Sequence, residues 1–175
     1  YFEGMYGVVF FYPLDFTFVC PSEIIAFHHR IGAFSERGAR VVSVSIDSQF
    51  SHYAWRETPI EKGGIGQVDF PMVADVSKHI MSSYGVAAPS GEGHLGSLAL
   101  RATFVIDPKF VISHTTINDL PLGRNVDEFL RIIDALKFHE EHGEVCPAGW
   151  QQGQPAMQAS SQGVANYLSK HAEKL

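Results

Sequence analysis

The sequence predicts an α/β fold in which helices flank a small mixed β-sheet, followed by a C-terminal arm. Two apolar runs, at residues 6–12 and 40–47, are separated by a segment of helical periodicity. Two further β-rich runs, at 102–106 and 110–117, are joined by the short segment 107–109 (Asp-Pro-Lys). The first arrangement is typical of parallel strands with a helical crossover, and the second of an antiparallel hairpin. With 175 residues, 45% of them hydrophobic, the chain can bury a core without a disulfide framework.

The N-terminal part of the chain predicts a strand–helix–strand unit. Residues 6–12 form a continuous apolar run, which is typical of a strand buried on both faces. A helical region follows from Cys20 until Gly38 ends it, because one apolar stripe recurs at helical spacing. The stripe consists of Cys20, Ile24, Phe27, Ile31 and Phe34. Residues 40–47 form the second strand, which we expect to lie parallel to the first.

The middle of the chain predicts shorter elements. A helix passes through Tyr53 and Trp55 and stops before Pro59. The glycine-rich segment 61–66 is expected to be a flexible loop, and residues 70–73 a short strand.

Two capping patterns mark further helices. Ser77 is expected to cap a short helix that Gly85 ends. Residues 88–97 are expected to form a loop before the hairpin. Asn125 and Glu128 form a plausible capping pair at the start of the last long helix.

The C-terminal segment differs from the rest in composition. Residues 147–160 are rich in Gln, Gly and Pro and are expected to form a mobile arm, and residues 163–170 a last short helix. No internal repeat is visible. We therefore expect a domain over residues 1–142 and an arm over residues 143–175.

Charge and composition exclude several classes of partner. The net charge of −6 and the pI near 5.8 argue against binding to nucleic acid or to an anionic membrane. No apolar run reaches the roughly 20 residues of a membrane helix. No signal peptide is visible, so we expect a cytoplasmic protein. The histidines predict no metal site, since His28 and His29 point in different directions on a helix, and His139 and His142 have no evident third ligand.

The two cysteines are the residues that point to chemistry. Cys20 lies where an apolar strand gives way to a helix, so backbone N–H groups and the positive end of the helix dipole favour its thiolate. Cys146 lies in the polar tail, and both cysteines precede a proline. This arrangement indicates redox chemistry in which the second thiol resolves what the first has done.

Longer motifs surround these cysteines and carry a family resemblance. Residues 10–23 read FFYPLDFTFVCPSE, residues 118–124 read NDLPLGR, and residues 143–150 read GEVCPAGW. Shorter matches are HYAW at 52–55, GGIG at 63–66 and FPMVAD at 70–75. By these motifs the chain resembles the typical two-cysteine peroxiredoxins, and most of all their bacterial alkyl hydroperoxide reductase C-type members. The resemblance covers nearly the whole chain.

The resemblance implies a thioredoxin-like (peroxiredoxin) fold and a set of catalytic residues. Cys20 would be the nucleophile that attacks the peroxide O–O bond. The hydroxyl of Thr17 would bond the sulfur and the peroxide, and Pro13 would shield the pocket. Arg101 would donate to the sulfur and to a peroxide oxygen at once. The product of attack is a Cys20 sulfenic acid, formed without a cofactor.

Two further assignments concern residues around this set. Glu23 and Arg124 match a pair that holds Arg101 in place, although a purely structural ion pair is the alternative. Cys146 would condense with the sulfenic acid to a disulfide. Because a disulfide needs Cα atoms within about 7 Å, the helix that begins at Cys20 would have to unwind in part.

The resemblance also implies partners. In the typical class the resolving cysteine belongs to the other chain of an antiparallel homodimer, and five dimers often form a ring. The reductant would be a flavoprotein disulfide reductase or thioredoxin, and hydrogen peroxide and alkyl hydroperoxides the substrates. A holdase chaperone or redox relay is the alternative function. A thioredoxin-like disulfide oxidoreductase is disfavoured, because the chain has no C-x-x-C motif.

Two departures from the family pattern are visible. Family members begin well before the active-site strand, whereas this chain begins at Tyr1, so we expect N-terminal strands to be missing and a sheet edge to be exposed. Sensitive members also pair the GGIG loop with a C-terminal Tyr-Phe, where this chain has Tyr167 and Leu168. We therefore expect a less firmly pinned helix at Cys20.

Overall fold

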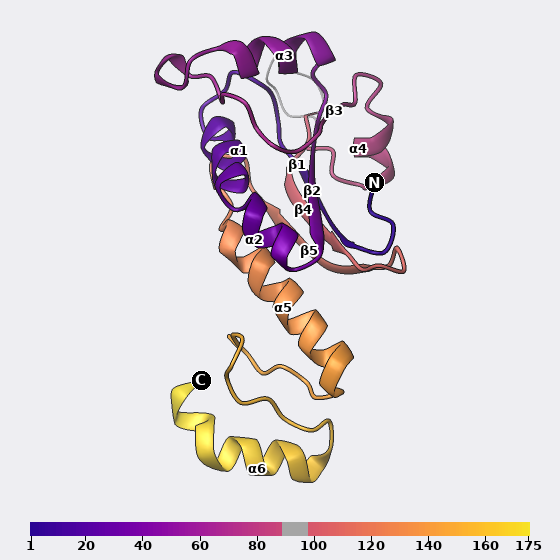
Figure 1. Ribbon diagram of the computed structural model, residues 1–175, viewed down its shortest axis with the longest axis vertical. Helices are drawn as coiled ribbons and strands as arrows, with labels where there is room; N and C mark the ends of the chain where they lie inside the picture. The colour runs from indigo at the N-terminus through magenta and orange to yellow at the C-terminus, as the bar shows by residue number, and fades with distance from the viewer. Residues whose placement is uncertain (89–97) are drawn as a thin grey trace. The chain divides into compact units, whose positions relative to one another are not determined.

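The computed structural model describes residues 1–88 and 98–175 and divides into two compact units, Tyr1–Val126 and Asp127–Leu175 (Figure 1). From residue 89 on, the loop expected at 88–97 lies outside the described residues. The boundary predicted between residues 142 and 143 falls inside the second unit and stays a proposal.

The first unit contains a five-stranded mixed sheet in the order β3-β2-β1-β4-β5. β1 pairs in parallel with β2, and β2 with β3, while β1/β4 and β4/β5 are antiparallel. The predicted mixed sheet, the parallel first pair and the hairpin are therefore confirmed. The strands are β1 (Tyr6–Phe11), β2 (Ala39–Ser45), β3 (Met72–Ala74), β4 (Arg101–Ile106) and β5 (Ile112–Asn118).

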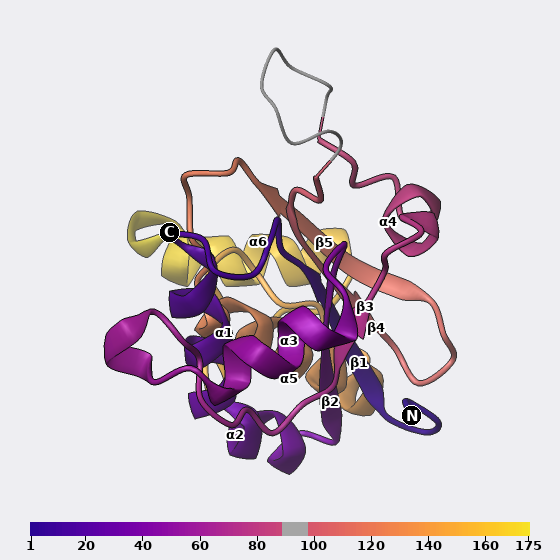
Figure 2. The same ribbon diagram turned by 90° about the horizontal axis from the view of Figure 1, so that it is seen from above.

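Helices cover both faces of β1. Figure 2 shows α1 (Cys20–His29) and α2 (Ile31–Glu36) on one side and α4 (His79–Ser83) on the other. All six residues of β1 are buried. On one face the ring of Phe10 stacks on Phe27 of α1, with centroids 4.0 Å apart. On the other face Phe11 shares a core cluster with Met81 of α4 and Phe104 of β4. The predicted burial of this strand on both faces is confirmed.

The helical region after Cys20 is broken in two. α1 (Cys20–His29) and α2 (Ile31–Glu36) are separated at Arg30, whose φ of −108° and ψ of 6° are not helical. The single stripe through Phe34 therefore spans two helices that pack the same core. α3 (Gln49–Glu57) ends before Pro59 as predicted, and the short 3₁₀ helix η1 (Ile60–Lys62) follows.

The predicted cap of the short helix α4 (His79–Ser83) is wrong. The carboxylate of Asp75, not the Ser77 hydroxyl, accepts from the backbone N–H groups of Ile80 and Met81, at 3.1 and 2.8 Å. An ionised carboxylate at the end of β3 reaches both donors and complements the helix dipole better than one hydroxyl. Gly85 ends the helix at a φ of +67°, as its missing side chain allows.

The second unit contains α5 (Val126–His142) from its second residue on, α6 (Ser161–His171) and the 3₁₀ turn η2 (Ala172–Lys174). Between them the chain turns back on itself, and Val145 and Met157 exchange two backbone hydrogen bonds of 2.8 and 3.1 Å. Ser160 caps α6 by accepting from the N–H of Gly163, so this helix begins slightly before the predicted range 163–170. No helix of the described residues is long and apolar enough to cross a membrane.

Candidate active site

Cys20 is the first residue of α1 and is fully buried. Its position follows from the chain path, since β1 ends at Phe11 and the loop 12–19 leads directly into the helix. The N–H groups of Ser22 and Glu23 both point back to the carbonyl of Val19. The predicted placement of a buried thiol at a helix start is confirmed.

Arg101 donates from Nη1 to the sulfur of Cys20 at 3.3 Å. The sheet register accounts for this contact, because Phe10 of β1 pairs with Thr103 of β4, so β4 begins beside the end of β1. The guanidinium is held from two other directions. Nε donates to the carbonyl of Leu120 at 2.6 Å, and Nη1 to Glu23 at 2.6 Å.

Glu23 joins Arg101 to the second arginine that the sequence singled out. Its Oε1 accepts from Nε and from the backbone N–H of Arg124, at 2.8 and 3.1 Å, while Oε2 accepts from Arg101. The Glu23 side chain is 2% exposed, so both ion pairs are shielded from water. The Glu23–Arg124 pair is thus not separate from Arg101, because one carboxylate serves both cations.

Arg124 is itself fixed by the sheet. Its Nη1 donates to the carbonyls of Phe11 and Ala102 and to the hydroxyl of Thr103, at 2.8, 3.0 and 3.2 Å. Its guanidinium also lies 4.9 Å from the centroid of the Phe10 ring. Burial lowers the pKa of Arg124, and the charge of Glu23 opposes that shift.

The charges of this buried cluster have a direct chemical consequence. The two guanidinium groups and the single Glu23 carboxylate leave one uncompensated positive charge, directly beside the Cys20 sulfur. The cluster therefore places a cation against the sulfur of a fully buried cysteine, where water does not screen the charge.

Thr17 and Pro13 lie in the loop that leads to Cys20. The hydroxyl of Thr17 donates to the carbonyl of Leu14 at 2.8 Å, so its single proton is not donated to the sulfur. Pro13 is buried at the start of the same loop.

A polar network that sequence reasoning missed anchors this loop to α3. Asp15 accepts from the Tyr12 hydroxyl at 2.7 Å and from the Ser51 hydroxyl at 2.8 Å, and its Oδ2 lies 2.8 Å from Nδ1 of His52. Burial, then the Asp15 charge, raise the pKa of Tyr12 well above 10. Burial opposes protonation of His52, but the hydrogen bond and charge of Asp15 outweigh it and raise the pKa of His52. The motif letters around Asp15 and His52 were visible in the sequence, but nothing in them indicated this pairing.

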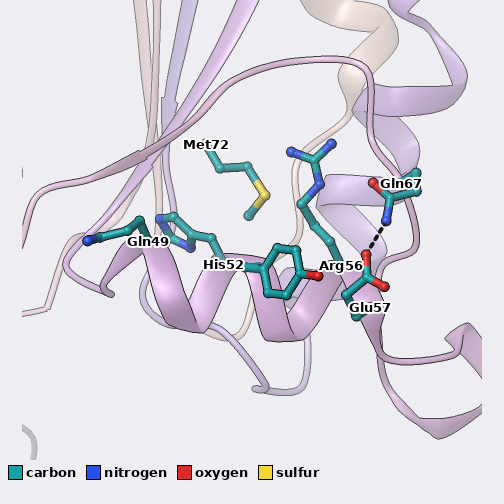
Figure 3. A pocket seen from close by; sticks show the side chains of 7 residues that line it. Gln49, His52, Arg56, Glu57, Gln67 and Met72 are labelled. Atoms are coloured by element: carbon teal, nitrogen blue, oxygen red, sulfur yellow. Dashed lines mark hydrogen bonds between the residues drawn. The ribbon is translucent and has the colours of Figure 1, made fainter.

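A small cavity lies beside His52 of this network, along α3 (Figure 3). It measures about 240 Å³, and at one end Gln67 donates to Glu57 at 2.7 Å. Figure 3 marks this hydrogen bond with a dashed line. Cys20 and Arg101 are not among its lining residues, which are Gln49, His52, Tyr53, Arg56, Glu57, Gln67 and Met72. The cavity is therefore separate from the sulfur site.

Cys146 belongs to the second unit and is a half-buried free thiol. Its sulfur donates to the carbonyl of Ala135 in α5, at 3.6 Å. Burial raises the pKa of Cys146, and the nearby charge of Arg131 acts in the opposite direction. In residues 1–88 and 98–175, no group of three His, Cys, Asp or Glu side chains is placed to hold a metal ion.

Comparison with known proteins identifies relatives over nearly the full length. The AhpC/TSA family matches residues 1–115, and the C-terminal domain of 1-Cys peroxiredoxin matches residues 135–170. Alkyl hydroperoxide reductase C of Helicobacter pylori is 55% identical over 169 residues, which are 97% of this chain and 82% of that protein. The structure of reduced 2-Cys peroxiredoxin from Plasmodium vivax superposes with a TM-score of 0.90 at 47% identity, over 96% of this chain and 84% of that one.

A third relative bears on assembly. Prx1a of Plasmodium yoelii, modified at its N-terminus and described as forming an artifactual octamer, is 48% identical. It superposes with a TM-score of 0.72 over 85% of this chain and 83% of its own.

Proposed function

The chain belongs to the AhpC/TSA family and is a thiol peroxidase of the peroxiredoxin type, and we propose that Cys20 is the nucleophile with which it reduces hydrogen peroxide and alkyl hydroperoxides. The observation that carries the proposal is the contact of 3.3 Å between Arg101 and the sulfur of a buried cysteine at a helix start. The contact combines a cation with shielding from water at the sulfur of a helix-start cysteine.

The first step transfers one oxygen to sulfur. The Cys20 thiolate attacks the terminal oxygen of the hydroperoxide, an S–O bond forms, and the O–O bond breaks. The electron pair of that bond leaves with the distal oxygen as an alkoxide or hydroxide, which takes a proton. Arg101 donates to the sulfur and to the peroxide oxygen, Thr17 accepts from the peroxide, and Glu23 with Arg124 fixes Arg101. Cys20 is left as a sulfenic acid.

The second step uses Cys146. Its thiolate attacks the Cys20 sulfur, an S–S bond forms, the S–O bond breaks, and the hydroxyl leaves as water. In this proposal the disulfide joins two chains of an antiparallel homodimer. A dithiol reductant, either a flavoprotein disulfide reductase or thioredoxin, then supplies two electrons and restores both thiols.

The assembly and location are part of the same proposal. β5 is an edge strand of the sheet with exposed apolar side chains at Ile112 and Ile117, a surface suited to pairing with a second chain. We infer homodimers that assemble into rings of five. Two free cysteines, one of them fully buried beside a cation, fit the reducing conditions of the cytoplasm.

Non-reducing gel electrophoresis after one equivalent of hydrogen peroxide tests the mechanism. The wild type should give a dimer band that Cys146→Ser and Cys20→Ser both abolish. A disulfide confined to monomers would overturn the intersubunit step, and a dimer band that persists in Cys146→Ser would overturn the role of Cys146. The relatives favour peroxidase activity over a holdase function. Cys20→Ser should lose peroxide turnover, and a variant that keeps it would overturn the role of Cys20.

A further inference from the structure

The segment that carries Cys146 runs back along one face of α5. His139 lies 2.7 Å from the carbonyl of Glu144, Cys146 contacts the carbonyl of Ala135, and Arg131 donates to the carbonyl of Trp150 at 2.9 Å. The partners in α5 come earlier as the segment proceeds, so the segment 144–150 is antiparallel to the helix. Figure 1 shows the chain turning back after α5.

Arg131 is the charged anchor of this segment. Its Nε and Nη2 form a two-pronged ion pair with Glu128, both at 2.7 Å, which leaves Nη1 directed at Trp150. The hydrogen bond to Glu128 raises the pKa of Arg131, so the donor stays charged. A charged donor to a carbonyl is about twice as strong as a neutral one.

Aromatic packing also fixes the C-terminal end of the segment, at Trp150. The buried indole of Trp150 lies 4.9 Å from the ring of Phe138, and the His142 ring stacks on Phe138 with centroids 4.4 Å apart. The indole N–H donates to the carbonyl of Gln154 at 3.0 Å. Arg131 and Phe138 are two turns apart on α5 and hold Trp150 between them.

The docked segment keeps Cys146 in its unreactive form. Its sulfur donates to a carbonyl oxygen, which only a thiol can do, and it is half-buried. Condensation with a sulfenic acid needs an accessible thiolate. Undocking removes both the burial and the carbonyl contact.

We propose that Arg131, oriented by Glu128, is a positioning residue that docks the segment 144–150 on α5 and thereby slows the attack of Cys146 on the Cys20 sulfenic acid. The proposal rests on the resolving role of Cys146 proposed above. Slower resolution leaves the sulfenic acid exposed for longer to a second peroxide. That peroxide transfers an oxygen to sulfur and leaves as water, which converts Cys20 to a sulfinic acid. Arg131 therefore sets the peroxide level at which the enzyme inactivates.

Rapid quench with non-reducing gels separates the two steps. The loss of peroxide reports the oxidation of Cys20, and the appearance of dimer reports the attack of Cys146. Arg131→Met should speed the second step by about tenfold, as loss of one charge-assisted hydrogen bond implies. An unchanged rate of Cys20 oxidation in Arg131→Met would show that the Cys20 site of this variant remains folded. Glu128→Gln, which keeps the shape of its side chain, should act in the same direction with a smaller effect.

Arg40→Met is the matched control, because it removes one exposed arginine charge outside the second unit and should leave the second step unchanged. The dose of peroxide that converts half of Cys20 to sulfinic acid, measured by peptide mass, should rise in Arg131→Met. A second step that slows or stays the same in Arg131→Met and Glu128→Gln would overturn the proposal. If the wild type itself shows no dimer, the proposed role of Cys146 fails instead.

Alkylation of Cys146 in a Cys20→Ser background measures docking without catalysis. Arg131→Met should increase the rate of alkylation at pH 8, because the undocked thiol escapes burial. If Arg131 acted only through its charge on the sulfur, its removal would slow alkylation. That result would overturn the docking role.

Discussion

Replacement of Arg101 should slow the reaction with peroxide while the fold survives. Its guanidinium contacts the Cys20 sulfur at 3.3 Å, Glu23 at 2.6 Å and the carbonyl of Leu120 at 2.6 Å. Arg101→Met removes the cation and the donor to the reacting oxygen. Loss of one such donor costs about 100-fold to 1,000-fold in other enzymes. We expect the second-order rate constant for hydrogen peroxide to fall by about 100-fold or more.

The same change also has a structural cost that must be separated from the catalytic one. Arg101→Met leaves Oε2 of Glu23 without its partner, although Oε1 remains paired with Arg124. Breaking a buried ion pair costs about 3–5 kcal/mol, and the remaining pair should keep the loss near the lower value. Arg101→Lys retains a charge but cannot reach all three partners, so its rate constant should lie between those of the wild type and Arg101→Met.

Stopped-flow measurement of the first oxidation step, with urea unfolding in parallel, gives both quantities. Arg40→Met is the matched control, because Arg40 is an exposed arginine that contacts Tyr1 and no part of the sulfur site. Its rate constant should equal that of the wild type. A folded Arg101→Met protein that reacts with peroxide within about threefold of the wild type would refute the role of the cation in catalysis.

Three further predictions follow from single contacts. Glu23→Gln leaves two buried guanidinium groups without their shared carboxylate, and urea unfolding should show a loss of about 3–5 kcal/mol; a loss below 1 kcal/mol would contradict the shared-carboxylate arrangement. Because the pKa of His52 is raised, its pairing with Asp15 stabilises the fold fully below the unfolded pKa of about 6.5 and is lost as pH rises through the folded value. The stability difference between the wild type and His52→Asn should therefore be larger at pH 5.5 than at pH 9, and an equal difference would contradict it. Asp75→Ala should destabilise the protein by about 1–2 kcal/mol in thermal unfolding, whereas Ser77→Ala should have little effect. A larger loss in Ser77→Ala than in Asp75→Ala would show that Ser77 caps α4.

The sequence predicted those parts of the fold that depend on periodicity. The apolar run at 6–12 and the run at 40–47 became the parallel pair β1 and β2, because continuous burial leaves a strong pattern. The break at Arg30 was not predictable, since the apolar stripe continues across it. The cap at Asp75 was missed because both Asp75 and Ser77 are good capping residues. The position of the chain at the end of β3 decides that the Asp75 carboxylate, and not the Ser77 hydroxyl, reaches α4.

The candidate site shows the same division. A motif could name Cys20, Arg101 and Glu23, but their contact depends on the register between β1 and β4. The pairing of Asp15 with His52 joins residues 37 positions apart and left no periodic signal. Long-range polar pairs of this kind follow from the packing of α3 beside the loop, which local sequence does not encode.

Trapping of the Cys20 sulfenic acid tests the central claim most directly. Cys146→Ser protein would be treated with one equivalent of hydrogen peroxide in the presence of dimedone, and the adduct located by peptide mass spectrometry. We predict one adduct, at Cys20, formed as the peroxide disappears and absent from the Cys20→Ser/Cys146→Ser protein. Folded protein that leaves the peroxide unconsumed and Cys20 as a free thiol would contradict the account.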